Sequence, residues 1–137
     1  MELLNIPCLT DTQIIALIEC AEQTALRFCA PVYLVGSAVS KLYPNDIDLY
    51  VAVKGDSYIR LFANYNRKTE AKDSHGCHTE NIKAMQIQQA KIIRKQKEYF
   101  ESKIKGWDFD IKFQIIETFV QHKGERIRLD RIYEGLW

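Results

Sequence analysis

The chain has 137 residues, of which 47% are hydrophobic and 27% are charged, as in an ordinary soluble globular domain. This composition excludes a disordered, collagen-like or coiled-coil protein. Nineteen lysines and arginines nearly balance eighteen acidic residues, so the net charge of +1 favours neither a nucleic acid nor a membrane as partner. No basic segment followed by an apolar core opens the chain, and no stretch approaches about 18 apolar residues. We therefore expect one cytoplasmic domain over residues 1–137, with no membrane segment.

The first predicted element is a helix that follows Thr10 and ends before Pro31. Thr10 and Gln13 have the spacing of a capping box, in which each side chain bonds the other residue's backbone amide. Apolar residues then recur every three or four positions and form one stripe: Ile14, Leu17, Ile18, Ala21, Ala25 and Phe28. We expect this helix to be structural, with its stripe buried.

A short strand over residues 32–35 is followed by the turn Gly36-Ser37 and by a short helix over residues 38–43. A glycine at such a turn lets backbone amides approach an anion, and a helix beginning at Ala38 would direct its positive end to the same place. The Ser37 hydroxyl adds a hydrogen-bond donor. The turn is therefore a candidate phosphate site, although Gly-Ser after a strand is also common as a simple turn.

Two further predicted strands, over residues 46–53 and 107–119, each carry two aspartates on one face. Strand side chains alternate with a period of two, so Asp46 and Asp48 share a face, as do Asp108 and Asp110. Aspartate is disfavoured in strands and costly to bury unpaired. If the strands are neighbours, the carboxylates converge and need cations; Mg²⁺ binds such oxygens and completes its shell with water and substrate phosphates. The pattern predicts a two-metal site for phosphoryl or nucleotidyl transfer.

A long helix is predicted from Thr79 to about Lys105, because this segment contains neither proline nor glycine and ends at Gly106. Residues 81–105 include seven basic and two acidic residues. This surface could attract an RNA backbone, a triphosphate or an acidic protein, or could be a solvated helix face. An amphipathic helix is also expected over residues 58–65, and a strand or helix over residues 132–137 that packs back onto the sheet.

The order of these motifs resembles the DNA polymerase beta-like nucleotidyltransferase superfamily. The motifs are Gly36-Ser37 after a hydrophobic strand, Asp46-Ile47-Asp48 after a gap of eight residues, and Phe109-Asp110-Ile111 in a distal strand. The segment 44–51 looks especially like the minimal nucleotidyltransferases. The resemblance covers about residues 32–116 and implies an α/β (α+β) fold, in which a small mixed sheet packs helices on one face and carries the carboxylates on the other.

Site roles follow from the resemblance residue by residue. It implies that Asp46 and Asp48 hold two Mg²⁺ or Mn²⁺ ions, and that Asp110 completes the site and helps activate the attacking hydroxyl. It also implies that Gly36 and Ser37 cradle the β- and γ-phosphates.

Three further charged residues have alternative or additional roles in the implied site. Lys112 shares the face of Asp110 and either contacts the triphosphate or serves as a counter-charge. Asp108 is the alternative to Asp110 as third ligand. Minimal nucleotidyltransferases usually carry an arginine where this chain has Val39; the next basic residue, Lys41, is the candidate to contact the triphosphate in its place.

The activity implied is transfer of a nucleoside monophosphate from a nucleoside triphosphate such as ATP to a hydroxyl, with release of pyrophosphate. The acceptor would be a protein, an RNA or a small molecule, and a chain this short would rely on a partner subunit or on a macromolecular acceptor for recognition. The alternative is a nucleotide-binding, antitoxin-like or regulatory partner protein that acts by binding.

Overall fold

The computed structural model describes residues 4–55, 79–116 and 124–130. The expected helix at 58–65 and the expected element at 132–137 lie outside these ranges. The described elements are two α-helices, one 3₁₀ helix and four strands: α1 (Asp11–Phe28), β1 (Val32–Val35), η1 (Gly36–Val39), β2 (Ile47–Val53), α3 (Thr79–Lys103), β3 (Phe109–Ile115) and β4 (Arg126–Arg128). Neither described helix is long and apolar enough to cross a membrane.

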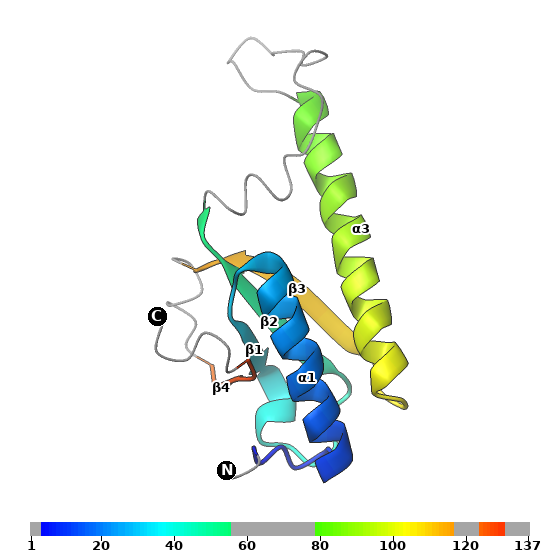
Figure 1. The fold of residues 1–137 in the computed structure, drawn as a ribbon. Coiled ribbons are helices and arrows are strands. Elements are labelled where there is room, and N and C mark those ends of the chain that lie inside the picture. The colour runs from blue at the N-terminus through cyan, green and yellow to red at the C-terminus, as the bar shows by residue number, and fades with distance from the viewer. Residues whose placement is uncertain (1–3, 56–78, 117–123, 131–137) are drawn as a thin grey trace.

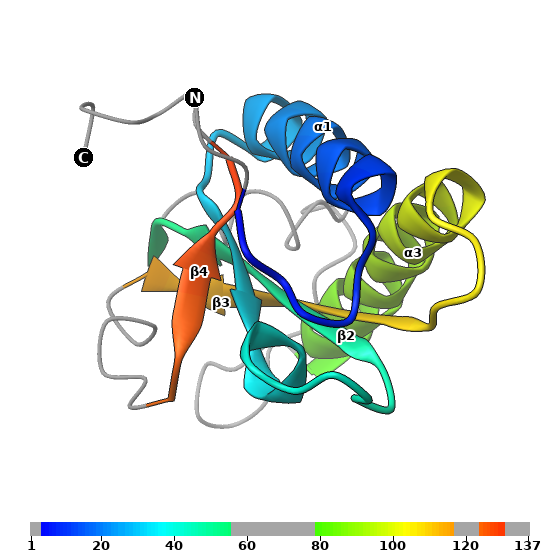
Figure 2. The same cartoon turned by 90° about the horizontal axis from the view of Figure 1, so that it is seen from below.

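The four strands form one mixed sheet in the order β3-β2-β1-β4. Strand β1 runs antiparallel to both β2 and β4, while β2 and β3 are parallel. Helices α1 and α3 lie side by side on one face of this sheet (Figures 1 and 2). The described residues therefore have an α+β fold with a small mixed sheet and helices on one face, as the sequence predicts.

The hydrophobic core lies between the two helices and the sheet. Alternate residues of β1, β2 and β3, such as Leu34, Leu49 and Ile111, are almost fully buried there. Phe100 of α3 packs on Phe109 of β3, with ring centres 5.4 Å apart. The intervening residues of each strand consequently point to the opposite face of the sheet.

Both predicted ends of the first helix are confirmed in atomic detail. The Gln13 amide nitrogen donates to Thr10 Oγ1, and the Thr10 amide nitrogen donates to Gln13 Oε1, which completes the capping box. After α1, Cys29 adopts a left-handed conformation with φ of 51°. Helix α3 ends two residues earlier than predicted, at Lys103, and Gly106 follows with φ of 89°.

The predicted helix over residues 38–43 is wrong. Only one 3₁₀ turn forms, at Gly36–Val39, after which the amides of Ser40 and Lys41 donate to the Ser37 carbonyl. The chain leaves the helical conformation at Ser40, whose φ is −132°, and then continues to Ile47, where β2 begins antiparallel to β1.

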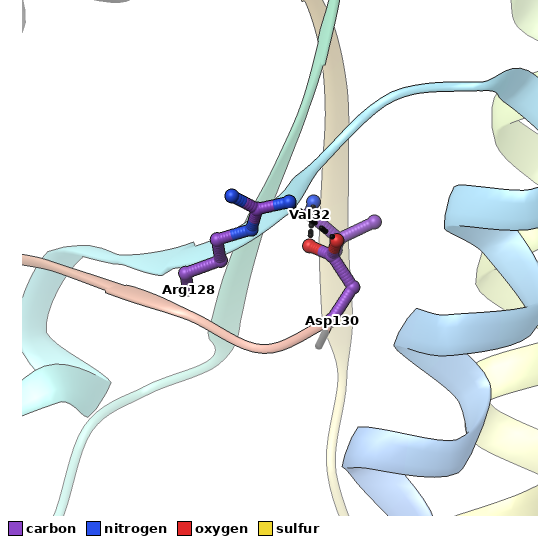
Figure 3. A network of polar contacts seen from close by, with 3 residues as sticks. All are labelled: Val32, Arg128 and Asp130. Carbon is purple, nitrogen blue, oxygen red and sulfur yellow. Dashed lines mark hydrogen bonds and ion pairs between the residues drawn. The ribbon is translucent and has the colours of Figure 1, made fainter. Parts of the chain in front are cut away.

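Strand β4 was not predicted as such, and it is held in the sheet by the buried side chain of Asp130 (Figure 3). The Val32 amide nitrogen donates to Asp130 Oδ1 over 2.6 Å, and Arg128 Nη2 donates to Asp130 Oδ2 over 3.2 Å. The carboxylate therefore ties the end of β4 to the start of β1, and β4 adds a fourth strand beside β1 with Arg126 opposite Val35.

Candidate functional site

Three aspartates meet on the sheet face opposite the helices. Asp48 of β2 and Asp110 of β3 are register partners in the parallel pairing, so they lie side by side on neighbouring strands. Asp46 precedes β2 and lies two residues from Asp48, on the same face. One carboxylate oxygen of each residue can be chosen so that all three lie within 4.8 Å of one another. The structure thus brings together the three carboxylates that the sequence singles out.

The absence of a side chain at Gly36 leaves room for the carboxylate of Asp48. Its φ of 76° is a conformation that other residues rarely adopt, and a Cβ placed there would lie 2.6 Å from Asp48 Oδ2. The turn at the end of β1 therefore admits the Asp48 carboxylate against its backbone. This close approach is the physical reason for glycine at position 36.

Negative charge accumulates at Asp48. Partial burial raises the pKa of the Asp48 carboxyl above its usual value, and the charges of Asp46 and Asp110 raise it further. Lys112 opposes this rise: its Nζ lies 3.9 Å from Asp110 Oδ2 and 5.9 Å from the ring centre of Tyr50. One exposed lysine does not neutralise three carboxylates. The donor set, made only of carboxylate oxygens, suits a hard divalent ion such as Mg²⁺ or Mn²⁺.

Ser37 and Lys41, the other predicted phosphate-binding residues of this segment, lie in and just after η1. Ser37 is half-buried within η1, next to Gly36. Lys41 is exposed after η1 and is not among the described residues that line the cleft beside the carboxylates. Because η1 is a single 3₁₀ turn, the expected positive end of a helix at Ala38 is absent from this part of the described chain. What the turn offers an anion is its backbone and the Ser37 hydroxyl.

A cleft of about 490 Å³ opens between the carboxylates and α3. Asp108 belongs to it but lies outside the described group of three carboxylates. The described lining residues come from the start of β2, from β3 and from α3: Asn45, Asp46, Ile93, Lys97, Asp108, Phe109, Asp110 and Ile111. An acceptor that enters here would reach Asp110, whose side chain is 49% exposed.

The basic residues of α3 are divided between two surfaces. Lys97 lines the cleft beside the carboxylates and pairs with Glu101 over 3.7 Å. Lys91 and Lys95 instead line a separate cleft between α3 and α1, together with Arg27. These three lysines of α3 therefore line two different clefts.

Glu101 also links α3 to the strand that carries Asp110. Its Oε2 accepts a hydrogen bond from the Phe109 amide nitrogen over 3.3 Å, and the Ile47 amide nitrogen donates to the Asp108 carbonyl over 2.9 Å. These two contacts fix where β3 begins relative to α3 and β2. They thereby set the position of Asp110 beside Asp48.

The sequence interpretation missed the arginines of β4, of which Arg126 lies in the same row as the carboxylates. It begins β4 and is the register partner of Val35, which is in turn the partner of Asp48. Its signal in the sequence is the three-residue alternation of β4, which is too short to predict a strand.

No protein-family model, curated protein or solved structure matches the chain.

Proposed function

We propose that this chain is a metal-dependent nucleotidyltransferase that moves a nucleoside monophosphate from a nucleoside triphosphate to a hydroxyl and releases pyrophosphate. The observation that carries the proposal is the convergence of Asp46, Asp48 and Asp110 to within 4.8 Å, with the Gly36 turn against Asp48. The mixed sheet, with helices on one face and carboxylates on the other, is also what a polymerase beta-like fold would provide.

In this proposal the three aspartates hold two Mg²⁺ or Mn²⁺ ions. Such ions neutralise charge on the triphosphate and lower the pKa of the attacking hydroxyl. The protein's own residues position the triphosphate. Gly36 and Ser37 present backbone amides and a hydroxyl to the β- and γ-phosphates, and Lys112 places a positive charge next to Asp110.

Asp110 has the exposure needed to act on the acceptor. Its carboxylate lies on β3, beside the cleft, and receives the proton of the acceptor hydroxyl as that oxygen bonds to the α-phosphorus. The bond from the α-phosphorus to the bridging oxygen breaks, and pyrophosphate leaves with its electron pair. Asp48, which is more buried, keeps its role as a fixed ligand.

The acceptor is proposed to be macromolecular and to enter through the cleft that Lys97 and Asp108 line. A protein or RNA acceptor would bring its own recognition surface, and a partner subunit could do the same. A small-molecule acceptor is the other class that this cleft admits.

The proposal is tested by transfer of label from nucleoside triphosphates to a cell lysate in the presence of Mg²⁺ or Mn²⁺. We expect label from the α-phosphate, but not from the γ-phosphate, to appear in one macromolecule, and Asp48→Asn to abolish it. Asp11→Asn is the control, because it removes the same charge from an exposed residue at the start of α1 and leaves the group of three carboxylates intact.

Two other outcomes are informative. Tight nucleotide binding without any transfer would favour the alternative, a regulatory or antitoxin-like partner that acts by binding. Neither binding nor transfer with any triphosphate would contradict the proposed function.

A further inference from the structure

We propose that Arg126 completes a polyphosphate site with the turn at Gly36 and Ser37, and binds the triphosphate tail of the substrate. This inference rests on the proposed function and adds to it a ligand-binding residue from a distant part of the chain. It follows from the register of the four strands, which places Arg126 on the same face and in the same row as the carboxylates.

The row runs across the whole sheet. Asp110 of β3 is the partner of Asp48 in β2, Asp48 is the partner of Val35 in β1, and Val35 is the partner of Arg126 in β4. Directly paired residues point to the same face, and neighbouring strands are about 4.8 Å apart. Arg126 and Asp48 are therefore separated at the backbone by about 10 Å, a distance that a phosphate chain and a long side chain can bridge.

The Gly36 turn follows Val35 immediately, so it lies between the carboxylates and Arg126. Lys112 follows Asp110 by two residues on β3 and is the register partner of Tyr50, so it lies on the same face, one pair further along the strands. A triphosphate whose α-phosphate lies at the carboxylates and whose tail crosses the turn would run toward Arg126. Its four negative charges would then meet Lys112 near the carboxylates and Arg126 near the tail.

The environment of Arg126 fits this role. It is exposed at the start of β4, and its guanidinium carbon lies 5.7 Å from the ring centre of Tyr33, which keeps the group on this face. Arg128, the other arginine of β4, has its Nη2 3.2 Å from the buried Asp130 carboxylate. Arginine binds phosphate through two parallel hydrogen bonds, which gives orientation as well as attraction.

The test is a calorimetric titration with Mg²⁺ and three probes: inorganic tripolyphosphate and the non-hydrolysable analogues of ATP and GTP. We expect Arg126→Gln to weaken all three by about ten- to a hundredfold, the loss of one charge-assisted contact. Arg126→Lys should retain part of the affinity. Arg27→Gln is the matched control, because Arg27 is an exposed arginine that stacks on a ring, with 5.2 Å to the Phe28 centre, in the helix layer.

The outcomes separate this inference from the proposed function. Thermal unfolding first shows whether Arg126→Gln is folded. If the folded variant binds the probes as tightly as wild type does, the inference is wrong and the proposed function stands. A loss confined to the nucleotides, or a wild type that binds nucleotides but not tripolyphosphate, would also overturn it, because the contact would then not be to phosphate. A wild type that binds none of the three contradicts both.

Discussion

Replacing Asp48 with asparagine should stabilise the metal-free protein while removing its divalent-ion binding. Asp48 is the central carboxylate of the site, with Asp46 before it on the same face and Asp110 opposite it on β3. Asparagine has nearly the same volume and shape as aspartate but carries no charge. The substitution therefore removes the repulsion without opening a cavity, and under the proposed function it also removes an oxygen ligand of the metal ions.

The size of the effect follows from the geometry. Two unit charges about 5 Å apart repel each other by about 1 kcal/mol at the dielectric constant of water, and salt reduces this further. The side chains are partly exposed, so the water limit applies more closely than the interior one. Asp48 takes part in two such pairs, while its attraction to Lys112 offsets some of the gain. We expect the free energy of unfolding to rise by about 1 kcal/mol, or Tm by roughly 3–5 °C.

The stabilisation should depend on pH in a defined direction. The pKa of Asp48 is higher in the folded protein than in the unfolded chain, so folding favours the protonated form. Below the ordinary aspartate pKa of about 4, Asp48 is neutral in both the folded and the unfolded state, so its charge makes no difference between the stabilities of wild type and Asp48→Asn. As pH rises through the raised pKa, wild type loses stability and the variant does not, so the difference in Tm should grow toward neutral pH.

Thermal unfolding in EDTA between about pH 4 and 7.5, with Mn²⁺ titrations of both proteins, measures these effects. Asp108→Asn serves as control, since it changes the same charge on an exposed residue outside the group of three carboxylates and should retain Mn²⁺ binding. A variant that is less stable than wild type in EDTA, or that binds Mn²⁺ as tightly, would refute the reasoning.

Three further substitutions test local features by urea unfolding. Gly36→Ala should destabilise the metal-free protein by about 2 kcal/mol, because Cβ meets the Asp48 carboxylate at a φ of 76°; an unchanged midpoint would contradict this contact. Asp130→Ala should lower the free energy of unfolding by about 3 kcal/mol, because the Val32 amide and the Arg128 guanidinium lose their shared partner. An unchanged free energy of unfolding would show that β4 is held by other contacts. Cys29→Gly should raise the free energy of unfolding by about 0.5–1 kcal/mol, because glycine adopts the left-handed φ of 51° at this position without strain. A lower urea midpoint would refute that interpretation.

Local sequence was sufficient where neighbouring residues determine the structure. The α1 start could be predicted because Thr10 and Gln13 bond each other's backbone three residues apart. The faces of β2 and β3 could be predicted because strand side chains alternate, which placed Asp48 and Asp110 on polar faces. The helix after Gly36 was predicted wrongly, since the chain leaves the helical conformation at Ser40 before it enters β2.

The remaining features depend on residues that are far apart in the sequence. Alternation gives Asp108 and Asp110 the same face, and only the register of β3 with β2 shows that Asp110 is the partner of Asp48. Strand β4 has three residues and is anchored by a hydrogen bond between Val32 and Asp130, 98 positions apart. Arg126 reaches the site's face only through that long-range pairing, so local pattern could not identify it.

The central claim is that the three aspartates bind divalent ions, and that these ions and the turn at Gly36 bind a triphosphate. A crystal structure of the protein soaked with Mn²⁺ and a non-hydrolysable nucleoside triphosphate, with anomalous diffraction measured at the manganese edge, tests it most directly. We predict two manganese peaks among Asp46, Asp48 and Asp110, with the triphosphate tail over Gly36 and toward Arg126. Manganese or nucleotide bound elsewhere, with no anomalous signal at these three carboxylates, would contradict the claim.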